Sequence, residues 1–167
     1  VTGSDGKTTT TTIIAKLLEA AGYHVHLGGN IGRPLLPDIE SIQPDDLAVL
    51  ELSSFQLMTM DTSADIAVVT NLAPNHLDIH KGMEEYIAAK KNIFLYQNAQ
   101  QKVILNRDND ITLSFVPEAK GQVTLFSRQN HLDEGVVLED GVICVKKDGN
   151  TRKVLPVADI LLPGVHN

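Results

Sequence analysis

The chain of 167 residues has the length of one domain, and its 43% hydrophobic and 21% charged residues indicate a globular rather than a disordered protein. Its 21 acidic against 14 basic residues give a net charge of −7, which argues against a nucleic-acid partner because phosphate backbones repel an acidic surface. The single cysteine, Cys144, excludes an internal disulfide and no apolar run reaches the roughly 18 residues of a membrane span, so we expect a cytoplasmic protein that binds no membrane.

The first two thirds of the chain alternate short apolar runs with helical spacing, which is typical of an α/β fold with a mainly parallel sheet flanked by helices. A strand end at Val1 and Thr2 leads through a glycine turn into a helix with apolar residues from 13 to 21. Further elements are strands at 23–27, 47–52, 66–70 and 102–105, and a helix at 83–96. Ligands of such folds bind beyond the carboxyl ends of the strands, so we expect the site in the loops that follow them.

The pattern changes from Val123 onward. Short strands are predicted at 136–138, 142–145 and 153–155, separated by the hairpin turn signals Asp140-Gly141 and Asp148-Gly149. We expect a small antiparallel meander with a structural role. The chain enters a motif within three residues, has no initial Met and stops at a turn sequence, so we also expect a fragment of a longer protein.

Residues 2–8, TGSDGKT, lie between the first strand end and the first helix, where backbone N–H groups and the helix dipole attract an anion. Glycines let the main chain wrap closely around phosphate, Lys7 supplies a mobile cation, and the Thr8 hydroxyl is placed to bind magnesium. The loop is shorter than the general phosphate-binding pattern, because Val1 stands where that pattern has a glycine. An ordinary glycine turn whose threonines cap the helix is the alternative, but position and composition favour nucleotide binding.

A carboxylate, Glu51, ends the predicted strand at 47–52, where it could hold a hard cation against phosphates bound by Lys7 and Thr8. The alternative is a buried acid paired with a structural Lys or Arg. Two histidines, His76 and His80, lie in the loop after the strand at 66–70. A lone loop histidine is more often a surface residue than a ligand, so the residues alone leave their role open.

Lys90 and Tyr86 are four residues apart in the predicted helix at 83–96 and therefore share one of its faces, while Lys91 points elsewhere. An unmodified ammonium group cannot bind magnesium. On spacing alone, we interpret Lys90 as a solvated helix lysine, and Glu84, Glu85 and Lys91 as the solvent-exposed face of the helix.

Six segments occur in a fixed order and together resemble the ATP-binding central domain of the Mur ligases: TGSDGKTTT, GGNIGRP, ELSSFQL, NLAPNHLDIH, EEYIAAKKNI and LLPGVHN. Within that family, SSFQL and GGNIG are similar to the branch that adds D-glutamate to UDP-N-acetylmuramoyl-L-alanine in peptidoglycan synthesis. The resemblance implies that residues 1–167 form a P-loop domain, and that a UDP-binding domain and an amino-acid-binding domain flank it in the whole protein. It also implies a monomer.

The reaction implied by the resemblance is an ATP-dependent ligation. ATP would phosphorylate the carboxylate of UDP-N-acetylmuramoyl-L-alanine, and the amine of D-glutamate would attack the acyl phosphate to form an amide, releasing ADP and phosphate. Such chemistry depends on positioning and charge neutralisation, so it needs no protein nucleophile. Two alternatives remain open: another Mur or folylpolyglutamate-type ligase, and a nucleotide-binding module without turnover.

The resemblance also assigns roles to residues. Lys7, His76 and Lys90 would be catalytic, and Asn30 and Ser53 would face the muramoyl substrate. Thr8 and Glu51 would bind one magnesium ion, and His76 a second, which Lys90 would help to hold as a carbamylated side chain whose carboxylate can accept metal. The nucleotide would contact Gly3, Ser4, Asp5, Gly6, Lys7, Thr8, Thr9 and Asn167, the last of which would reach toward adenine.

Overall fold

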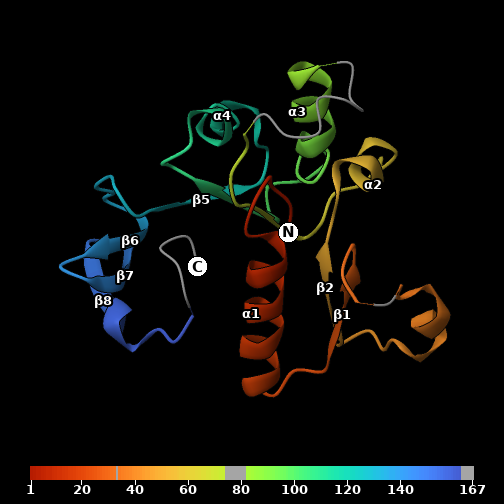
Figure 1. Cartoon of the computed structure of the whole chain (residues 1–167), viewed down its shortest axis with the longest axis horizontal. Helices are drawn as coiled ribbons and strands as arrows, with labels where there is room; N and C mark the ends of the chain where they lie inside the picture. Colours follow the sequence, from red (N-terminus) through yellow and green to blue (C-terminus); the bar gives the residue numbers. More distant parts are fainter. Residues whose placement is uncertain (33, 74–81, 163–167) are drawn as a thin grey trace.

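The computed structural model describes residues 1–32, 34–73 and 82–162 (Figure 1). Strands β1 (Val25–Gly29) and β2 (Leu47–Glu51) form a parallel pair. Six more strands form a second sheet in sequence order. They are β3 (Ile66–Val69), β4 (Lys102–Asn106), β5 (Gln122–Ser127), β6 (Gly135–Glu139), β7 (Val142–Lys147) and β8 (Asn150–Pro156). The pairs from β3 to β6 are parallel and those from β6 to β8 antiparallel, which confirms the predicted fold class.

The first two residues connect the two sheets. The Leu52 N–H donates to the Val1 carbonyl oxygen at 2.8 Å, and on the other side the Thr2 N–H donates to Val68 at 2.9 Å. Thr70 completes the pairing by donating its N–H to the Thr2 carbonyl at 3.0 Å. The predicted strand end is therefore confirmed, and the glycine loop that follows lies at the carboxyl edge of the neighbouring strands β2 and β3.

The helices lie on both sides of the sheet region. Figure 1 shows α1 (Lys7–Ala20) running away from the amino-terminal loop on one side, with α2 (Ser54–Met58), α3 (Met83–Lys91) and α4 (Asp110–Leu113) on the other. Short 3-10 helices are η1 (Leu36–Ser41), η2 (Val116–Glu118) and η3 (Val157–Asp159). In the part of the chain that is described, no helix has the length and apolarity needed to cross a bilayer.

The main hydrophobic core lies between the parallel strands and the helices on one face of the sheet. Strands β3 and β4 contribute alternating buried residues, which meet side chains of α2, α3 and the segment after α3. Its buried members include Leu57, Ala67, Val69, Tyr86, Ile93, Phe94, Val103, Leu105 and Phe115. Val137 of β6 and Cys144 of β7 form a smaller cluster with Leu132. The core thus holds β3, α2 and α3 in fixed positions around the amino-terminal loop.

Several elements differ from the sequence prediction, and hydrogen bonding explains three of these differences. The strand predicted at 23–27 is β1, shifted by two residues, because the Tyr23 N–H closes the end of α1 by donating to Leu18. The helix predicted at 83–96 ends at Lys91, because the Asn92 carbonyl accepts a hydrogen bond from the Ser63 hydroxyl instead of continuing the helix. The segment from Val123 belongs to β5, which extends the parallel sheet, so the antiparallel part begins only at β6.

The hairpin turns of the meander are confirmed. Asp140 and Asp148 have φ angles of 49° and 51°, and Gly141 and Gly149 both have 73°. Two consecutive positive φ angles are the signature of the tight turn that matches the twist of antiparallel strands, and Asp-Gly is one of the few dipeptides that adopt it readily. The local sequence therefore determines where these three strands reverse.

Candidate functional site

The glycine loop is held by the segment that follows β3. Gly3 has a φ of 150°, and a Cβ atom at this position would lie 2.0 Å from Thr70 Oγ1, so only glycine fits. The Ser4 N–H donates to the Asn71 carbonyl at 2.8 Å and the Asp5 N–H to Asn71 Oδ1 at 2.9 Å. The Thr70 hydroxyl donates to the Asp5 carbonyl at 2.7 Å. Contacts with the segment after β3 therefore define the shape of the loop.

The start of α1 offers an anion site. Gly6 is the N-cap residue, and no described side chain caps the helix, so the N–H groups of the first turn, which include those of Lys7, Thr8 and Thr9, are available to phosphate oxygens. Lys7 Nζ donates to the Ser4 carbonyl at 2.9 Å, which folds the ammonium group back over the loop. The Thr8 side chain bonds to Glu51 instead of capping the helix, so the capping role considered for it is wrong.

Glu51 lies at the end of β2 and is 2% exposed. Its Oε2 accepts the Thr8 hydroxyl at 2.7 Å, and its Oε1 accepts the Asn30 side-chain amide at 3.3 Å. Both partners are neutral, so among the described residues Glu51 is not part of the structural ion pair considered as its alternative. Three side chains singled out by the sequence are thus brought together, although they come from α1, from the end of β2 and from the loop after β1.

The Thr8 and Glu51 oxygens suit a magnesium ion. Mg²⁺ takes oxygen ligands at about 2.1 Å in an octahedron, whose adjacent ligands lie about 3.0 Å apart. Thr8 Oγ1 and Glu51 Oε2 are separated by 2.7 Å, so a small separation of the two atoms would admit the ion between them. The donor set therefore fits the metal that the sequence predicts here.

Lys90 is buried beneath the loop and is 2% exposed. The interpretation of Lys90 as a solvated helix lysine is therefore wrong, because the face of α3 that carries Tyr86 and Lys90 packs against the loop and Thr2. Its Nζ donates to Thr2 Oγ1 at 2.8 Å and to the Gly3 carbonyl at 3.1 Å, and it lies 5.3 Å from the centre of the Tyr86 ring. Lys91, the next residue, does point elsewhere and pairs with Glu118.

Burial and, to a smaller extent, the nearby Lys7 ammonium together lower the pKa of Lys90 to about 8, although the Glu51 carboxylate partly opposes both. The phenol of Tyr86 contacts the Ser4 hydroxyl at 3.1 Å, and burial raises the pKa of Tyr86 above its usual value. Lys90 can therefore lose its proton far more readily than an exposed lysine. A neutral amine in this position is a nucleophile beside the phosphate loop.

The two predicted substrate residues lie on the same side of the loop region. Asn30 follows β1 and contacts Glu51 through both its side chain and its N–H, the latter at 2.7 Å. Ser53 is the N-cap of α2 and exchanges hydrogen bonds with Gln56, so it also has a structural role as a helix cap. Of the remaining predicted residues, His76, His80 and Asn167 lie outside the described ranges.

Sequence reasoning missed the residues that hold the loop. Thr2 and Tyr86 contact Lys90 and Ser4, and Asn71 binds the loop backbone directly. Asn106, the last residue of β4, and Asn109, the N-cap of α4, support this segment, since their side-chain amides donate to the carbonyls of Thr70 at 2.8 Å and Leu72 at 3.0 Å. The available signal was an asparagine just after each of two neighbouring predicted strands.

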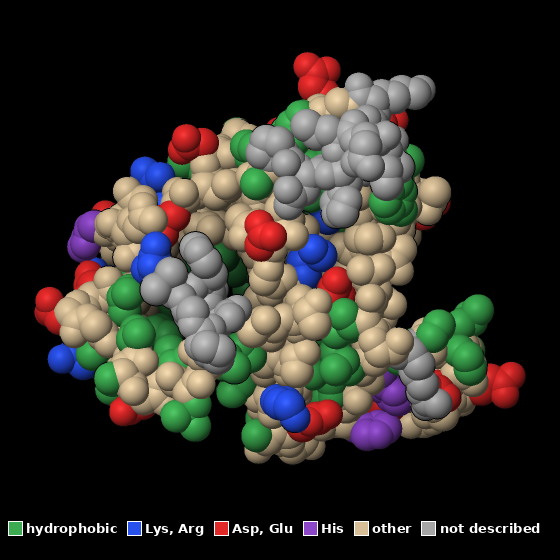
Figure 2. Space-filling view, in the orientation of Figure 1, with side chains coloured by type: hydrophobic (Ala, Val, Ile, Leu, Met, Phe, Trp, Pro, Cys, Tyr) green, Lys and Arg blue, Asp and Glu red, His purple; other side chains and the backbone are tan. Residues whose placement is uncertain are grey.

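The surrounding surface favours a small anion over a long phosphate backbone. On the face drawn in Figure 2, the described Lys and Arg side chains (blue) are scattered among acidic ones (red). The positive charge that is concentrated near the loop comes from Lys7 and Lys90, and the latter is buried. The positive charge near the loop is therefore local, and the chain as a whole is acidic, with a net charge of −7.

Three comparisons relate this chain to known proteins, two by sequence and one by structure. The family model described as the Mur ligase middle domain matches residues 1–167. A relative from Acetivibrio thermocellus, named UDP-N-acetylmuramoylalanine--D-glutamate ligase, is 58% identical over 168 residues, which cover 100% of this chain and 36% of the relative. The chain thus spans about a third of the length of that relative.

Two solved structures share the fold. A UDP-N-acetylmuramate:L-alanyl-gamma-D-glutamyl-meso-diaminopimelate ligase from Neisseria meningitides aligns with a TM-score of 0.69 at 18% identity, over 99% of this chain and 55% of the other. The MurF ligase of Thermotoga maritima in complex with ADP aligns with a TM-score of 0.66 at 20% identity, over 93% of this chain and 39% of the other. At these identities the match concerns the fold alone.

Proposed function

The chain belongs to the Mur ligase family, and from that premise we propose that it is the ATP-binding middle domain of a cytoplasmic UDP-N-acetylmuramoylalanine–D-glutamate ligase. The observation that carries the proposal is the convergence of Lys7, Thr8, Glu51 and Lys90 around one preformed glycine loop. The 58% identity to a relative of that name favours D-glutamate as the added amino acid. Regions for the UDP group and for the incoming amino acid would belong to other parts of the same monomeric protein.

The loop and the start of α1 would bind the phosphates of ATP. The N–H groups of the first turn point along the helix axis toward the loop, and the helix dipole adds a partial positive charge there. The Lys7 ammonium would leave the Ser4 carbonyl, 2.9 Å away, and move to the terminal phosphates. A structural neighbour, the MurF ligase of Thermotoga maritima, was solved in complex with ADP, which supports a nucleotide as the ligand.

Two magnesium ions would complete the site. Thr8 and Glu51 would hold the first, and His76, together with Lys90, would hold the second. Bound there, the ions would neutralise charge on the transferring phosphoryl group. The adenine end of the nucleotide would reach Asn167, and the muramoyl substrate would face Asn30 and Ser53.

Lys90 can assist a metal only after chemical modification, and its surroundings suit carbamylation. The neutral amine would attack carbon dioxide, forming an N–C bond and losing one proton, so that the side chain ends in a carboxylate. A pKa of about 8 leaves roughly half of the amine unprotonated at pH 8. The new negative charge would lie near Lys7, whose positive charge disfavours the unmodified ammonium.

The chemistry then requires positioning and charge neutralisation from the protein. The γ-phosphoryl group of ATP would pass to the carboxylate of UDP-N-acetylmuramoyl-L-alanine, and the amine of D-glutamate would displace phosphate from the acyl carbon. Lys7 would neutralise charge on the transferring group, and the rigid loop would fix its direction. The Ser4 N–H donates to the Asn71 carbonyl at 2.8 Å and the Asp5 N–H to Asn71 Oδ1 at 2.9 Å, and these bonds hold the loop that carries Lys7 in place.

The test is phosphate release by the full-length protein with ATP, magnesium and UDP-N-acetylmuramoyl-L-alanine, adding D-glutamate, L-glutamate, L-lysine or no amine. We expect sustained release only with D-glutamate. Release with another amine, or only with a folate acceptor, would keep the ligase chemistry but contradict the D-glutamate assignment. ATP binding without release would instead favour a nucleotide-binding module without turnover.

The carbamate is tested in the same assay with Lys90→Ala. We expect ligation to be lost, ATP binding to be nearly unchanged, and activity to return in part when short carboxylates such as acetate are added. Lys91→Ala is the matched control, since Lys91 is on the same helix but pairs with Glu118 away from the loop. Full ligation by Lys90→Ala would contradict the role proposed for Lys90.

A further inference from the structure

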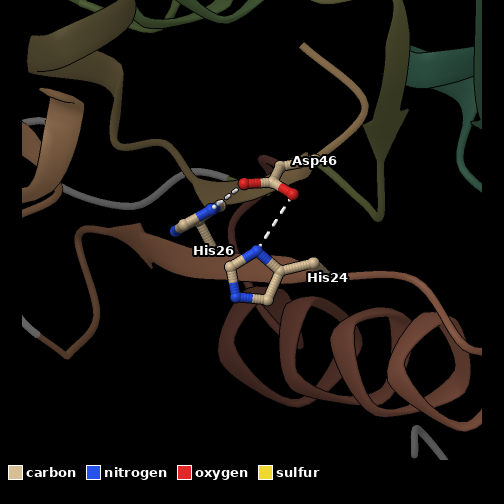
Figure 3. A group of neighbouring side chains, drawn as sticks. All are labelled: His24, His26 and Asp46. Carbon is tan, nitrogen blue, oxygen red and sulfur yellow. Dashed lines mark hydrogen bonds and ion pairs between the residues drawn. The ribbon is translucent and has the colours of Figure 1, made fainter. Parts of the chain in front are cut away.

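A second group of metal-ligating side chains lies at the opposite end of the β1–β2 pair. His24 Nδ1 lies 2.9 Å from Asp46 Oδ1, and His26 Nε2 lies 2.8 Å from Asp46 Oδ2 (Figure 3). The two imidazole rings meet edge to face, with centres 4.7 Å apart. One nitrogen from each ring and a carboxylate oxygen all lie within 4.8 Å of one another.

The backbone determines this convergence. His24 directly precedes β1 and His26 is its second residue, so the two side chains, two residues apart, project on the same side. Asp46 immediately precedes β2, and the Leu47 N–H donates to the His24 carbonyl at 2.9 Å, which fixes the register between the two segments. The Gln43 N–H donates to Asp46 Oδ2 at 2.9 Å and thereby helps to orient the carboxylate.

The cluster is enclosed on one side and open on the other. The Asp46 and His26 side chains are only 8% and 12% exposed, whereas His24 is 71% exposed. The carboxylate and one imidazole are therefore held rigidly, and the second imidazole can adjust its position. An ion could enter past His24, which leaves room for a water molecule as a further ligand.

We propose that His24, His26 and Asp46 form a binding site for a transition-metal dication of the Zn²⁺ class. Two imidazole nitrogens and one carboxylate oxygen are ligands that such ions share, whereas Mg²⁺ and Ca²⁺ prefer oxygen alone. Tetrahedral ligands at 2.0–2.1 Å from a metal lie about 3.4 Å apart, so modest side-chain rotations would suffice. The ion would replace the two imidazole–carboxylate contacts, and each neutral imidazole would keep its proton on the other ring nitrogen.

This site is separate from the proposed magnesium site. Each of the two strands has five residues, and at about 3.3 Å per residue their ends lie roughly 13 Å apart. Glu51 and Asn30 lie at or just beyond the carboxyl ends, while His24 and Asp46 precede the amino ends. A metal ion would therefore brace the two strands that carry Glu51 and Asn30 without touching the phosphate loop.

The experiment is a calorimetric titration of the full-length protein with Zn²⁺ in excess Mg²⁺, which would occupy the two proposed magnesium sites. We expect one equivalent of Zn²⁺ to bind, and Co²⁺ in its place to show the intense visible absorption of a tetrahedral ion. His24→Ala and Asp46→Asn should each weaken Zn²⁺ binding at least tenfold. Because His24 is largely exposed, His24→Ala should keep its fold, which circular dichroism would verify.

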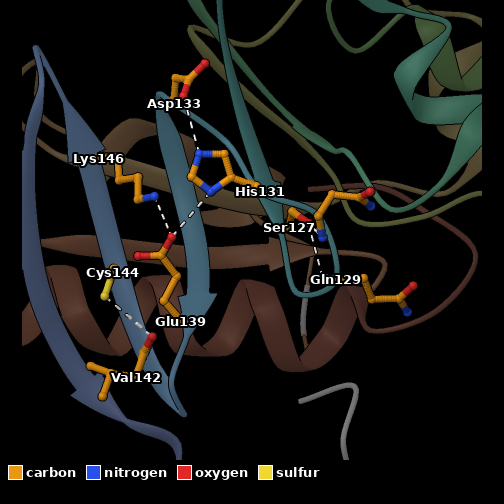
Figure 4. Close-up of polar contacts among 9 residues, drawn as sticks. Ser127, Gln129, His131, Asp133, Glu139, Val142, Cys144 and Lys146 are labelled. Carbon is orange, nitrogen blue, oxygen red and sulfur yellow. Dashed lines mark hydrogen bonds and ion pairs between the residues drawn. The ribbon is translucent and has the colours of Figure 1, made fainter.

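His131 provides the matched control. It lies 3.3 Å from Asp133 and 3.6 Å from Glu139, and Glu139 also pairs with Lys146 (Figure 4). With a single imidazole on an exposed segment, this group should not hold the ion, so His131→Ala should leave the Zn²⁺ affinity unchanged. The proposal is overturned if no Zn²⁺ binds in excess Mg²⁺, or if binding survives both His24→Ala and Asp46→Asn. Neither result bears on ligation, which does not involve these residues.

Discussion

Replacing Lys90 with methionine should make the chain more stable, although it removes a residue that we place in the reaction. Lys90 carries its ammonium group in a buried position, which lowers its pKa from 10.5 to about 8. At ~1.36 kcal/mol per pKa unit, keeping this charge costs the folded chain about 3 kcal/mol at pH 7. Methionine has a similar volume and no charge, so Lys90→Met removes this cost.

Part of the gain is lost again through hydrogen bonding. The Gly3 carbonyl would lose the donor that lies 3.1 Å away, at a cost of about 1–2 kcal/mol. The Thr2 hydroxyl would keep its own bond to the Leu52 carbonyl at 2.6 Å. We therefore expect Lys90→Met to raise the free energy of unfolding by about 1–2 kcal/mol at pH 7.

The pH dependence of stability distinguishes the effect of removing the charge from the effect of losing the hydrogen bond. The folded wild-type chain binds the Lys90 proton less tightly than the unfolded chain, so its stability rises as the pH increases from about 8 toward 10.5. The variant lacks this rise. Its advantage over the wild type should therefore be about 2–3 kcal/mol smaller at pH 10 than at pH 7, whatever the exact cost of the lost hydrogen bond.

The assay is urea unfolding of the 167-residue chain, followed by circular dichroism at pH 7, 8, 9 and 10 in buffers free of carbon dioxide, which would otherwise modify the amine. Lys91→Met is the control and should change stability by less than about 1 kcal/mol at pH 7, because the surface pair with Glu118 contributes little. A Lys90→Met variant that is less stable than the wild type by the same amount at every pH would refute the reasoning.

Three further experiments test the loop and the carboxylate next to it. Gly3→Ala should destabilise the chain by about 2–4 kcal/mol in urea unfolding, because the new Cβ would lie 2.0 Å from Thr70 Oγ1. Gly6→Ala meets no atom within 4 Å and should cost about 1 kcal/mol for its φ of 75° alone. Equal costs of the two substitutions would contradict the packing argument. Glu51→Gln should weaken magnesium-dependent ATP binding at least tenfold in calorimetry of the full-length protein, while metal-free binding changes little, and an unchanged magnesium dependence would exclude Glu51 as a ligand. Asp5→Asn should tighten ATP binding several-fold, since an exposed carboxylate beside the phosphates repels them, and weaker binding would show instead that Asp5 assists.

The sequence predicted those parts of the fold that depend on local chemistry. Strands β2, β3 and β4 appear as continuous apolar runs, and the Asp-Gly turns reverse the chain where they stand. The parallel pairing of β5 could not be predicted in this way, because its sequence, QVTLFS, is not the continuous apolar run that is typical of a buried parallel strand. That choice depends on the connections, which place α4 and η2 between β4 and β5.

In the candidate site, too, the sequence predicted what depends on local motifs and not what depends on long-range contacts. The motif residues Thr8 and Glu51 were assigned from sequence, and the structure brings their oxygens to 2.7 Å. The burial of Lys90 was not predictable from spacing, since helical periodicity groups Lys90 with Tyr86 but does not say which face is covered. That depends on contact with Thr2, which is 88 residues away in the chain. The His24 and His26 cluster likewise depends on the register that places Asp46 beside them.

The most direct test of the account follows the oxygen atoms of the substrate. UDP-N-acetylmuramoyl-L-alanine labelled with ¹⁸O in its carboxylate would be incubated with ATP, magnesium, D-glutamate and the full-length protein, and the released phosphate analysed by mass spectrometry. If the carboxylate is phosphorylated and the amine then displaces phosphate, one labelled oxygen should leave with each phosphate. Ligation that releases phosphate without the label would contradict an acyl-phosphate mechanism at this site.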